Sequence, residues 1–165
     1  MCVFAMLAAL MFASKKLMEL LPNIHLLGAL TVAYTAAFRK KAFIPLYLYI
    51  IIEGLFSGFA TWWIAYLYIW APLALAILAL PKNIPDRVAA VLYPTFSGLH
   101  GLAFGILYAP AQAIIFGLDF EGTLAWIAAG LPMDVIHGIS NFAFGFLALP
   151  LSRLLLKLSQ GKYTG

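Results

Sequence analysis

Two long stretches without a charged side chain constrain this chain more than any other feature. Residues 54–81 and 88–118 contain no Asp, Glu, Lys or Arg. Each stretch exceeds the length of about 20 apolar residues that an α-helix needs to cross a lipid bilayer. Hydrophobic residues make up 65% of the chain and charged residues 10%, whereas soluble domains average about 45–50% and 25%. The composition therefore predicts an all-α integral membrane protein and excludes an ordinary soluble domain.

The apolar segments divide into six predicted transmembrane helices, which form a single domain over residues 1–165. The approximate spans are Cys2–Leu17, Ile24–Phe38, Ala42–Phe59, 59–80, Val88–Phe116 and a last helix from about Trp126 that runs on into the sequence LSRLLLKLS. The fifth segment is too long for one untilted crossing. We expect Pro94 and Pro110 to divide it into an interfacial turn, a span and a frayed end.

The basic residues predict how these spans are oriented. Eight of the ten lie on one side of the six-span map, namely Arg39, Lys40, Lys41, Lys82, Arg87, Arg153, Lys157 and Lys162. Only Lys15 and Lys16 fall on the other side, together with Asp119 and Glu121. The positive-inside bias places the side with eight basic residues, and both termini, in the cytosol. The formal net charge of +4 therefore reflects loop topology, and we expect no nucleic-acid partner.

The start of the chain and its single cysteine exclude further classes. The first segment, MCVFAMLAALMFA, has no basic region ahead of it and no small-residue cleavage site after it. We therefore expect no cleaved signal peptide, and the abrupt start suggests a short cytosolic leader upstream. Cys2 is the only cysteine, which excludes an internal disulfide and a cysteine-based metal site.

The last predicted helix carries a polar stripe inside an apolar segment, WIAAGLPMDVIHGISNFAFGFLALP, over 126–150. At about 100° per residue, Asp134, His137 and Asn141 fall within an arc of roughly 60° on one helix face. An ionised Asp at the centre of a membrane helix costs about 2.5–3.5 kcal/mol, so such residues need a partner or a wet cavity and are usually functional. Pro132 should loosen the turn before them. These three side chains are therefore candidate ligand contacts, or they bond neighbouring helices together.

Aromatic residues at the outer end of the fourth span suggest the wall of a binding site. We expect Trp63 and Tyr66 to stack on a flat ligand, because aromatic rings pair favourably in offset or edge-to-face contact. An interfacial aromatic belt is the alternative for at least one of the tryptophans, including Trp62. We expect Gln112 in the fifth span to face the same outer half of the helix bundle. Apolar walls with a few polar groups are the usual form of a small-molecule site.

Glu53 and His100 are weaker candidates for substrate contacts, because each could satisfy the other inside the bundle. The three histidines could meet in principle, but their spacing matches no metal-ligand pattern. On the six-span map His25 lies near the outer end of its span, whereas His100 and His137 lie deeper. We therefore expect no metal site and no cofactor.

Enzyme motifs are absent from the sequence, which has no phosphate-binding loop, no HExxH and no GxSxG. We expect no catalytic residues, although a small intramembrane enzyme using Asp134 and His137 as an acid–base pair is one alternative.

The first span carries alanines at every fourth position, Ala5, Ala9 and Ala13, which would let another helix pack closely. A non-transporting assembly or scaffold protein is the second alternative.

Six short spans, the AxxxAxxxA ladder and the D-x-x-H-x-x-x-N run followed by Pro150-Leu151 resemble the substrate-binding subunit of an energy-coupling-factor (ECF) vitamin transporter. The resemblance covers essentially the whole chain. It implies a protein of the prokaryotic plasma membrane that captures a vitamin-like small molecule at the outer face and catalyses nothing itself.

The same resemblance implies the partners of the chain and the place of its site. A membrane scaffold subunit would dock on the alanine face, and two cytosolic ATPases would supply the energy for a toppling movement of the whole subunit. The ligand would lie in the outer half, beneath the loop after the first span and beside spans four to six. The sequence does not identify the vitamin.

Overall fold

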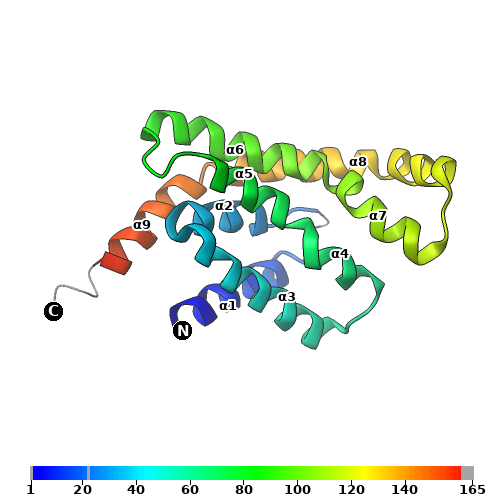
Figure 1. Cartoon of the computed structure of the whole chain (residues 1–165), viewed down its shortest axis with the longest axis horizontal. Helices are drawn as coiled ribbons and strands as arrows, with labels where there is room; N and C mark the ends of the chain where they lie inside the picture. Colours follow the sequence, from blue (N-terminus) through cyan, green and yellow to red (C-terminus); the bar gives the residue numbers. More distant parts are fainter. Residues whose placement is uncertain (1, 22, 161–165) are drawn as a thin grey trace.

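The computed structural model describes residues 2–21 and 23–160, and they are almost entirely helical (Figure 1). The helices are α1 (Cys2–Leu17), α2 (Leu27–Phe38), the 3-10 helix η1 (Arg39–Ala42), α3 (Phe43–Ser57), α4 (Thr61–Ile69), α5 (Ala71–Ala79), α6 (Asp86–Leu102), α7 (Phe104–Phe116), α8 (Phe120–Gly145) and α9 (Ala148–Gln160). No strand occurs within these ranges. The all-α prediction is confirmed.

Within the described residues, two helical segments, or three if one bent pair is counted as a single span, are long and apolar enough to cross a membrane. Helices α4 and α5 together form the continuous segment Thr61–Ala79, and α6 and α7 form Asp86–Phe116. Helices α8 and α9 give a third candidate if the bend of 46° between them is counted within one span. Helices α1, α2 and α3 have 16, 12 and 15 residues, each shorter than a typical span of about 20 residues. The six-span topology stays a prediction.

The surface of the bundle is unusually apolar. Large hydrophobic side chains such as Met6, Leu55, Ile114 and Ile139 are 66–83% exposed. Of the charged side chains in the described residues, only Glu53 and Asp134 are buried, and both lie inside helices. Contiguous apolar surface of this kind is typical of contact with a membrane or another protein.

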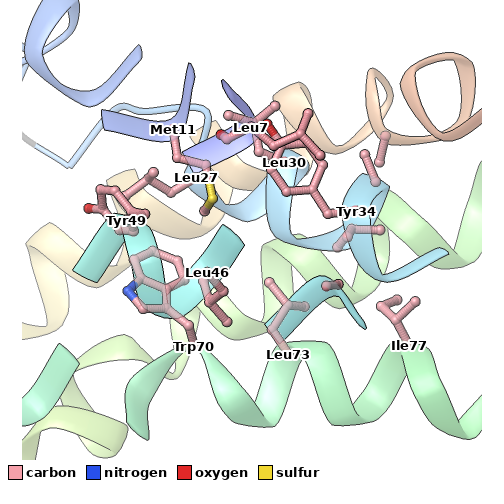
Figure 2. Close-up of a cluster of buried hydrophobic side chains, with 14 of the residues drawn as sticks. Leu7, Met11, Leu27, Leu30, Tyr34, Leu46, Tyr49, Trp70, Leu73 and Ile77 are labelled. Atoms are coloured by element: carbon pink, nitrogen blue, oxygen red, sulfur yellow. Dashed lines mark hydrogen bonds between the residues drawn. The ribbon is translucent and has the colours of Figure 1, made fainter. Parts of the chain in front are cut away.

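Helix α2 forms the centre of the fold and contacts α1, α5, α6, α8 and α9. Every residue from Leu27 to Thr35 is buried, which is expected for a helix that is apolar on all sides. Figure 2 shows the neighbouring cluster, in which Met11, Leu46, Tyr49 and Trp70 pack beside this helix. In a bilayer such a cluster is stabilised by close packing rather than by exclusion of water, because lipid is as apolar as leucine.

Glycines allow α6 and α8 to run side by side along one edge of the molecule (Figure 1). A Cβ on Gly101 would lie 2.7 Å from the carbonyl oxygen of His137, and one on Gly98 would lie 2.9 Å from Cβ of Phe142. A Cβ on Gly145 would overlap the backbone of Pro94. Small residues at a helix crossing let the two backbones approach closely.

The prolines of the fifth predicted segment do not divide it, so that prediction is wrong. Pro94 and Pro110 lie inside α6 and α7, and the helical path is interrupted at Ala103 instead. Pro132 likewise lies inside α8, which continues to Gly145. The interruption at Ala103 is stabilised from outside its own segment, because the Asp134 carboxylate on α8 accepts the backbone N–H of Gly105 at the start of α7.

Basic side chains hold the end of the bundle where α2 stops. Arg39 donates hydrogen bonds to the carbonyl oxygens of Leu78 and Leu80, at 2.5 and 3.0 Å, and so satisfies acceptors that the end of α5 leaves free. Arg153 on α9 pairs with Asp86 at the start of α6. The predicted cytosolic loops therefore lie at one end of the bundle, and the beginning of α2 faces the other.

Candidate functional site

A cavity of about 390 Å³ lies at the end of the bundle opposite these basic side chains. It is enclosed by the end of α1, the connection to α2, and parts of α3, α4, α7 and α8. The lining residues are Lys15, Met18, Glu19, Leu21, Asn23, Ile24, His25, Glu53, Ser57, Trp62, Tyr66, Phe104, Tyr108 and His137. The volume lies within the range of about 300–1,000 Å³ that is typical of small-molecule sites.

One wall of the cavity contains a buried ion pair. Lys15 Nζ lies 2.8 Å from Glu53 Oε1, and Lys16 Nζ lies 3.3 Å from the same oxygen. Ser57 donates a third hydrogen bond to that oxygen, at 3.0 Å. Glu53 is 1% exposed, and its Oε2 makes no hydrogen bond within the described part of the chain. Glu53 therefore lines the cavity, but its second oxygen is fully buried.

Aromatic rings form the adjoining wall. Trp62 and Tyr66 meet edge to face, with ring centroids 5.2 Å apart. The ammonium of Lys15 lies 5.6 Å from the Trp62 ring centroid and 5.1 Å from that of Tyr66, within the range of cation–π attraction. Phe104 and Tyr108 contribute rings from α7. The cavity thus offers both ring faces and a fixed charge pair.

Two histidines supply polar groups elsewhere in the lining. The rings of His25 and His137 meet edge to face with centroids 4.7 Å apart. His137 is 1% exposed, and neither of its ring nitrogens has a partner among the described residues; Nδ1 of His25 also has none there. The connection that carries His25 is attached to α8, because Ser140 donates to the carbonyl oxygen of Asn23 at 3.0 Å.

This arrangement corrects the expected depths of the histidines. His25 does not lie apart from His137 but contacts it, because the segment before α2 lies against α8. The alternative in which Glu53 and His100 satisfy each other does not occur in the structure. His100 Nε2 donates to the carbonyl oxygen of Ile69 at 2.8 Å, and Glu53 is held by the lysines of α1.

The polar stripe of α8 faces the interior of the bundle, as predicted. Asp134, His137 and Asn141 are 6%, 1% and 0% exposed. Only His137 lines the cavity. Asp134 accepts the N–H of Gly105 with both carboxylate oxygens at 3.1 Å, which caps the start of α7 as an N-cap side chain would. The three side chains therefore share a face but meet different neighbours.

Asn141 on α8 lies against α2 at Gly28, where the missing side chain lets the two helices approach closely. A Cβ on Gly28 would lie 3.0 Å from Oδ1 of Asn141 and 2.8 Å from Oγ of Ser97. Neither polar atom of the Asn141 side chain has a hydrogen-bond partner in the described ranges, and the residue does not line the cavity. Its geometry places it at the contact of α2, α6 and α8.

The remaining sequence candidates divide between the cavity and its surroundings. Tyr66 and Glu53 line the cavity, whereas His100, Trp63 and Gln112 do not. Trp63 donates its indole N–H to the carbonyl oxygen of Ile50 at 2.9 Å and so joins α4 to α3. His100 lies beneath Trp70, with ring centroids 5.3 Å apart. Trp63 and His100 therefore lie outside the lining and contact the helices that form the cavity walls.

The alanine ladder of α1 lies on the outside of the bundle. Ala5, Ala9 and Ala13 are exposed, whereas Ala8 and Met11 on the opposite side of the same helix are buried. The three alanines therefore form a flat strip that this chain does not use for its own packing.

Sequence reasoning missed His25 and Tyr108 as lining residues. It predicts Lys15, Lys16 and Glu19 either as snorkelling side chains or as a charged rim beside a binding site, and Lys15 and Glu19 do line the cavity. A signal for Lys15 was present, since two lysines on the predicted outer side oppose the positive-inside bias while Glu53 needs a partner inside its span. No comparable signal marks Tyr108, whose position depends on how α7 leans on α4 and α8.

Comparisons add no assignment to this site. Within the described residues, no group of three or more His, Cys, Asp or Glu side chains is placed to hold a metal ion. No protein-family model, curated protein or solved structure matches the chain.

Proposed function

We propose that the chain is a membrane-embedded substrate-binding subunit of the ECF type. It crosses the membrane six times with both termini in the cytosol and captures a vitamin-like small molecule from outside. A scaffold subunit docks on the Ala5, Ala9 and Ala13 face, and two cytosolic ATPases power the release of the ligand inward. The chain binds and delivers its ligand without changing it.

The position of the cavity carries this proposal. It lies at the end of the bundle away from Arg39, Asp86 and Arg153. The positive-inside bias assigns the end with these residues to the cytosol and the cavity end to the outer side. Its lining combines ring faces with a few polar groups, a usual composition for a ligand site. A scaffold protein that only packs against its partners has no need of an unpartnered buried histidine, because such a group is unfavourable in an apolar interior.

Mass spectrometry of ligand carried through gentle purification tests the proposal most directly. The chain should retain a small molecule in about equimolar amount, since dissociation from a site of this kind is slow when affinity is high. Denaturation should release that molecule chemically unchanged. A released product that differs from the molecule taken up would favour the intramembrane enzyme. Complete absence of small-molecule binding would favour the scaffold protein.

Reporter fusions test the proposed topology. Reporters at the N- and C-termini should both be active in the cytosol, because the basic loops are retained there. A third reporter placed after Phe116, in the turn before α8, should lie outside. A C-terminal reporter on the outer side would require an odd number of spans and would contradict the six-span arrangement.

Substitution of Ala9 tests the docking face. Ala9→Leu should abolish co-purification of ATPase activity with the tagged chain, because a bulky side chain separates helices that small residues allow to touch. Ligand binding by the isolated subunit should persist, since Ala9 faces away from the core. The matched control is Ala129→Leu at an exposed alanine of α8, which should leave co-purification intact. Normal assembly of the Ala9→Leu variant would show that this strip is not the docking face.

A further inference from the structure

The charges beside the cavity balance one another. Lys15 pairs with Glu53 at 2.8 Å, and Lys16 pairs with Glu19 at 3.2 Å and with Glu53 at 3.3 Å. Two positive and two negative side chains therefore leave no unpaired charge in this group. A ligand with a net charge would have to enter a partly buried site without a free counter-ion, which is unfavourable.

The same ion pair presents hydrogen-bond donors to the cavity. A lysine ammonium has three N–H donors, and the bond to Glu53 Oε1 uses one on Lys15. The Lys15 side chain is 21% exposed, whereas Oε2 of Glu53 is fully buried and out of reach of a ligand. A neutral carbonyl oxygen, as in an amide or lactam, can accept from Lys15 without adding a charge to the site.

The rest of the lining favours a flat molecule. Trp62 and Tyr66 stand at 82° to each other directly beside Lys15, so a planar ring bound at the ion pair can stack on one and meet the other edge-on. His137 lies elsewhere in the lining and contacts His25.

From these contacts we infer that the cavity selects flat, electrically neutral ring compounds that carry a carbonyl group, which Lys15 recognises while Glu53 balances its charge. This inference rests on the proposed function, because it takes the cavity to be the ligand site. It narrows the vitamin-like ligand to one chemical class. It also gives Lys15 a recognition role in addition to its ion pair with Glu53, which holds α1 against α3.

A matched set of four small probes tests this class on the whole chain in lipid nanodiscs. Benzamide is flat and neutral and carries the amide carbonyl; cyclohexanecarboxamide keeps this carbonyl but is not flat. Benzoate is flat and anionic, and benzylamine is flat and cationic. Affinities measured by ligand-observed NMR should place benzamide about ten-fold tighter than each of the others, a difference of about 1.4 kcal/mol.

Two variants should change this preference in opposite directions. Glu53→Gln keeps the size and one oxygen acceptor but leaves Lys15 without a carboxylate, while Lys16 keeps Glu19, so benzoate should gain about ten-fold relative to benzamide. Lys15→Met leaves Glu53 with Lys16 alone, so benzylamine should gain instead. Glu121→Gln makes the same change at an exposed carboxylate outside the cavity and should change none of the four affinities. Melting temperatures verify that each variant is folded. If one of Glu53→Gln and Lys15→Met does not fold, the other still tests the charge preference of the cavity.

Several outcomes would overturn the inference. Benzoate or benzylamine binding as tightly as benzamide would show that the cavity accepts a charged ligand, and equal binding of cyclohexanecarboxamide would show that flatness is not recognised. If the chain retains its own ligand but binds no probe, the chemical class is wrong while the proposed function stands. If it retains no ligand and binds no probe, both are wrong.

Discussion

Replacing Gly101 with alanine should destabilise the bundle by about 3 kcal/mol, the upper end of the usual range for overpacking a core. The added Cβ would lie 2.7 Å from the carbonyl oxygen of His137 and 2.9 Å from Cα of Gly138. Both are backbone atoms of α8, so no side chain can rotate away, and α6 and α8 must move apart. Thermal unfolding in detergent should show a large drop in melting temperature. Ligand binding should weaken too, because the same movement displaces His137 from the cavity.

The matched control for this prediction lies on α8 itself. A Cβ on Gly130 meets nothing within 4 Å, and alanine favours a helix over glycine by about 1 kcal/mol. Gly130→Ala should therefore leave the melting temperature unchanged or raise it. If Gly101→Ala unfolds at the wild-type temperature, the close crossing of α6 and α8 does not stabilise the fold.

Helix positions near the start of the chain could be predicted from sequence because they depend on local hydropathy. The first span was expected at Cys2–Leu17, and α1 has those bounds. The third was expected at Ala42–Phe59, and α3 covers Phe43–Ser57. Pro45 is tolerated in the first turn of α3, where backbone N–H groups have no partner within the helix. The sequence also predicts that Pro22 ends the first helix region, because proline cannot continue a helix, and Pro22 lies outside the described residues.

Helix interruptions could not be predicted in the same way because they depend on tertiary contacts. Pro94 and Pro110 carry the strongest local signal for a break, yet both lie within helices. The actual interruption at Ala103 is paired with Asp134, 31 positions later in the sequence, through the N–H of Gly105. Hydropathy identified Asp134 as a buried polar residue in need of a partner but could not identify a backbone amide on another helix as that partner.

The candidate site shows the same division between local and tertiary information. The sequence indicated Tyr66, Glu53 and His137, which do line the cavity. The sequence did not predict the contact between His25 and His137, because the position of His25 depends on how the connection before α2 folds back onto α8. Whether any of these residues binds a ligand stays a prediction.

Loss of both lysines that pair with Glu53 should have the second large effect. In the double variant Lys15→Met, Lys16→Met, the Glu53 carboxylate keeps only the hydrogen bond from Ser57 in a position that is 1% exposed. Removing the partners of a buried charge typically destabilises a protein by about 3–5 kcal/mol. The melting temperature of the double variant should therefore fall far below that of the wild type.

Replacing Glu53 should lower the melting temperature much less than replacing the two lysines, because the two sides of this ion pair are buried to different extents. The lysine side chains are 21% and 20% exposed and can turn toward water when Glu53 is replaced by methionine. The triple variant Lys15→Met, Lys16→Met, Glu53→Met should recover most of the stability lost in the double variant, since no buried charge remains and methionine suits an apolar helix contact. If the triple variant melts as low as the double variant, the lysines stabilise α1 through packing of their side-chain stems. Recovery would instead show that Lys15 and Lys16, the two basic residues that oppose the positive-inside pattern, are positioned there to neutralise Glu53.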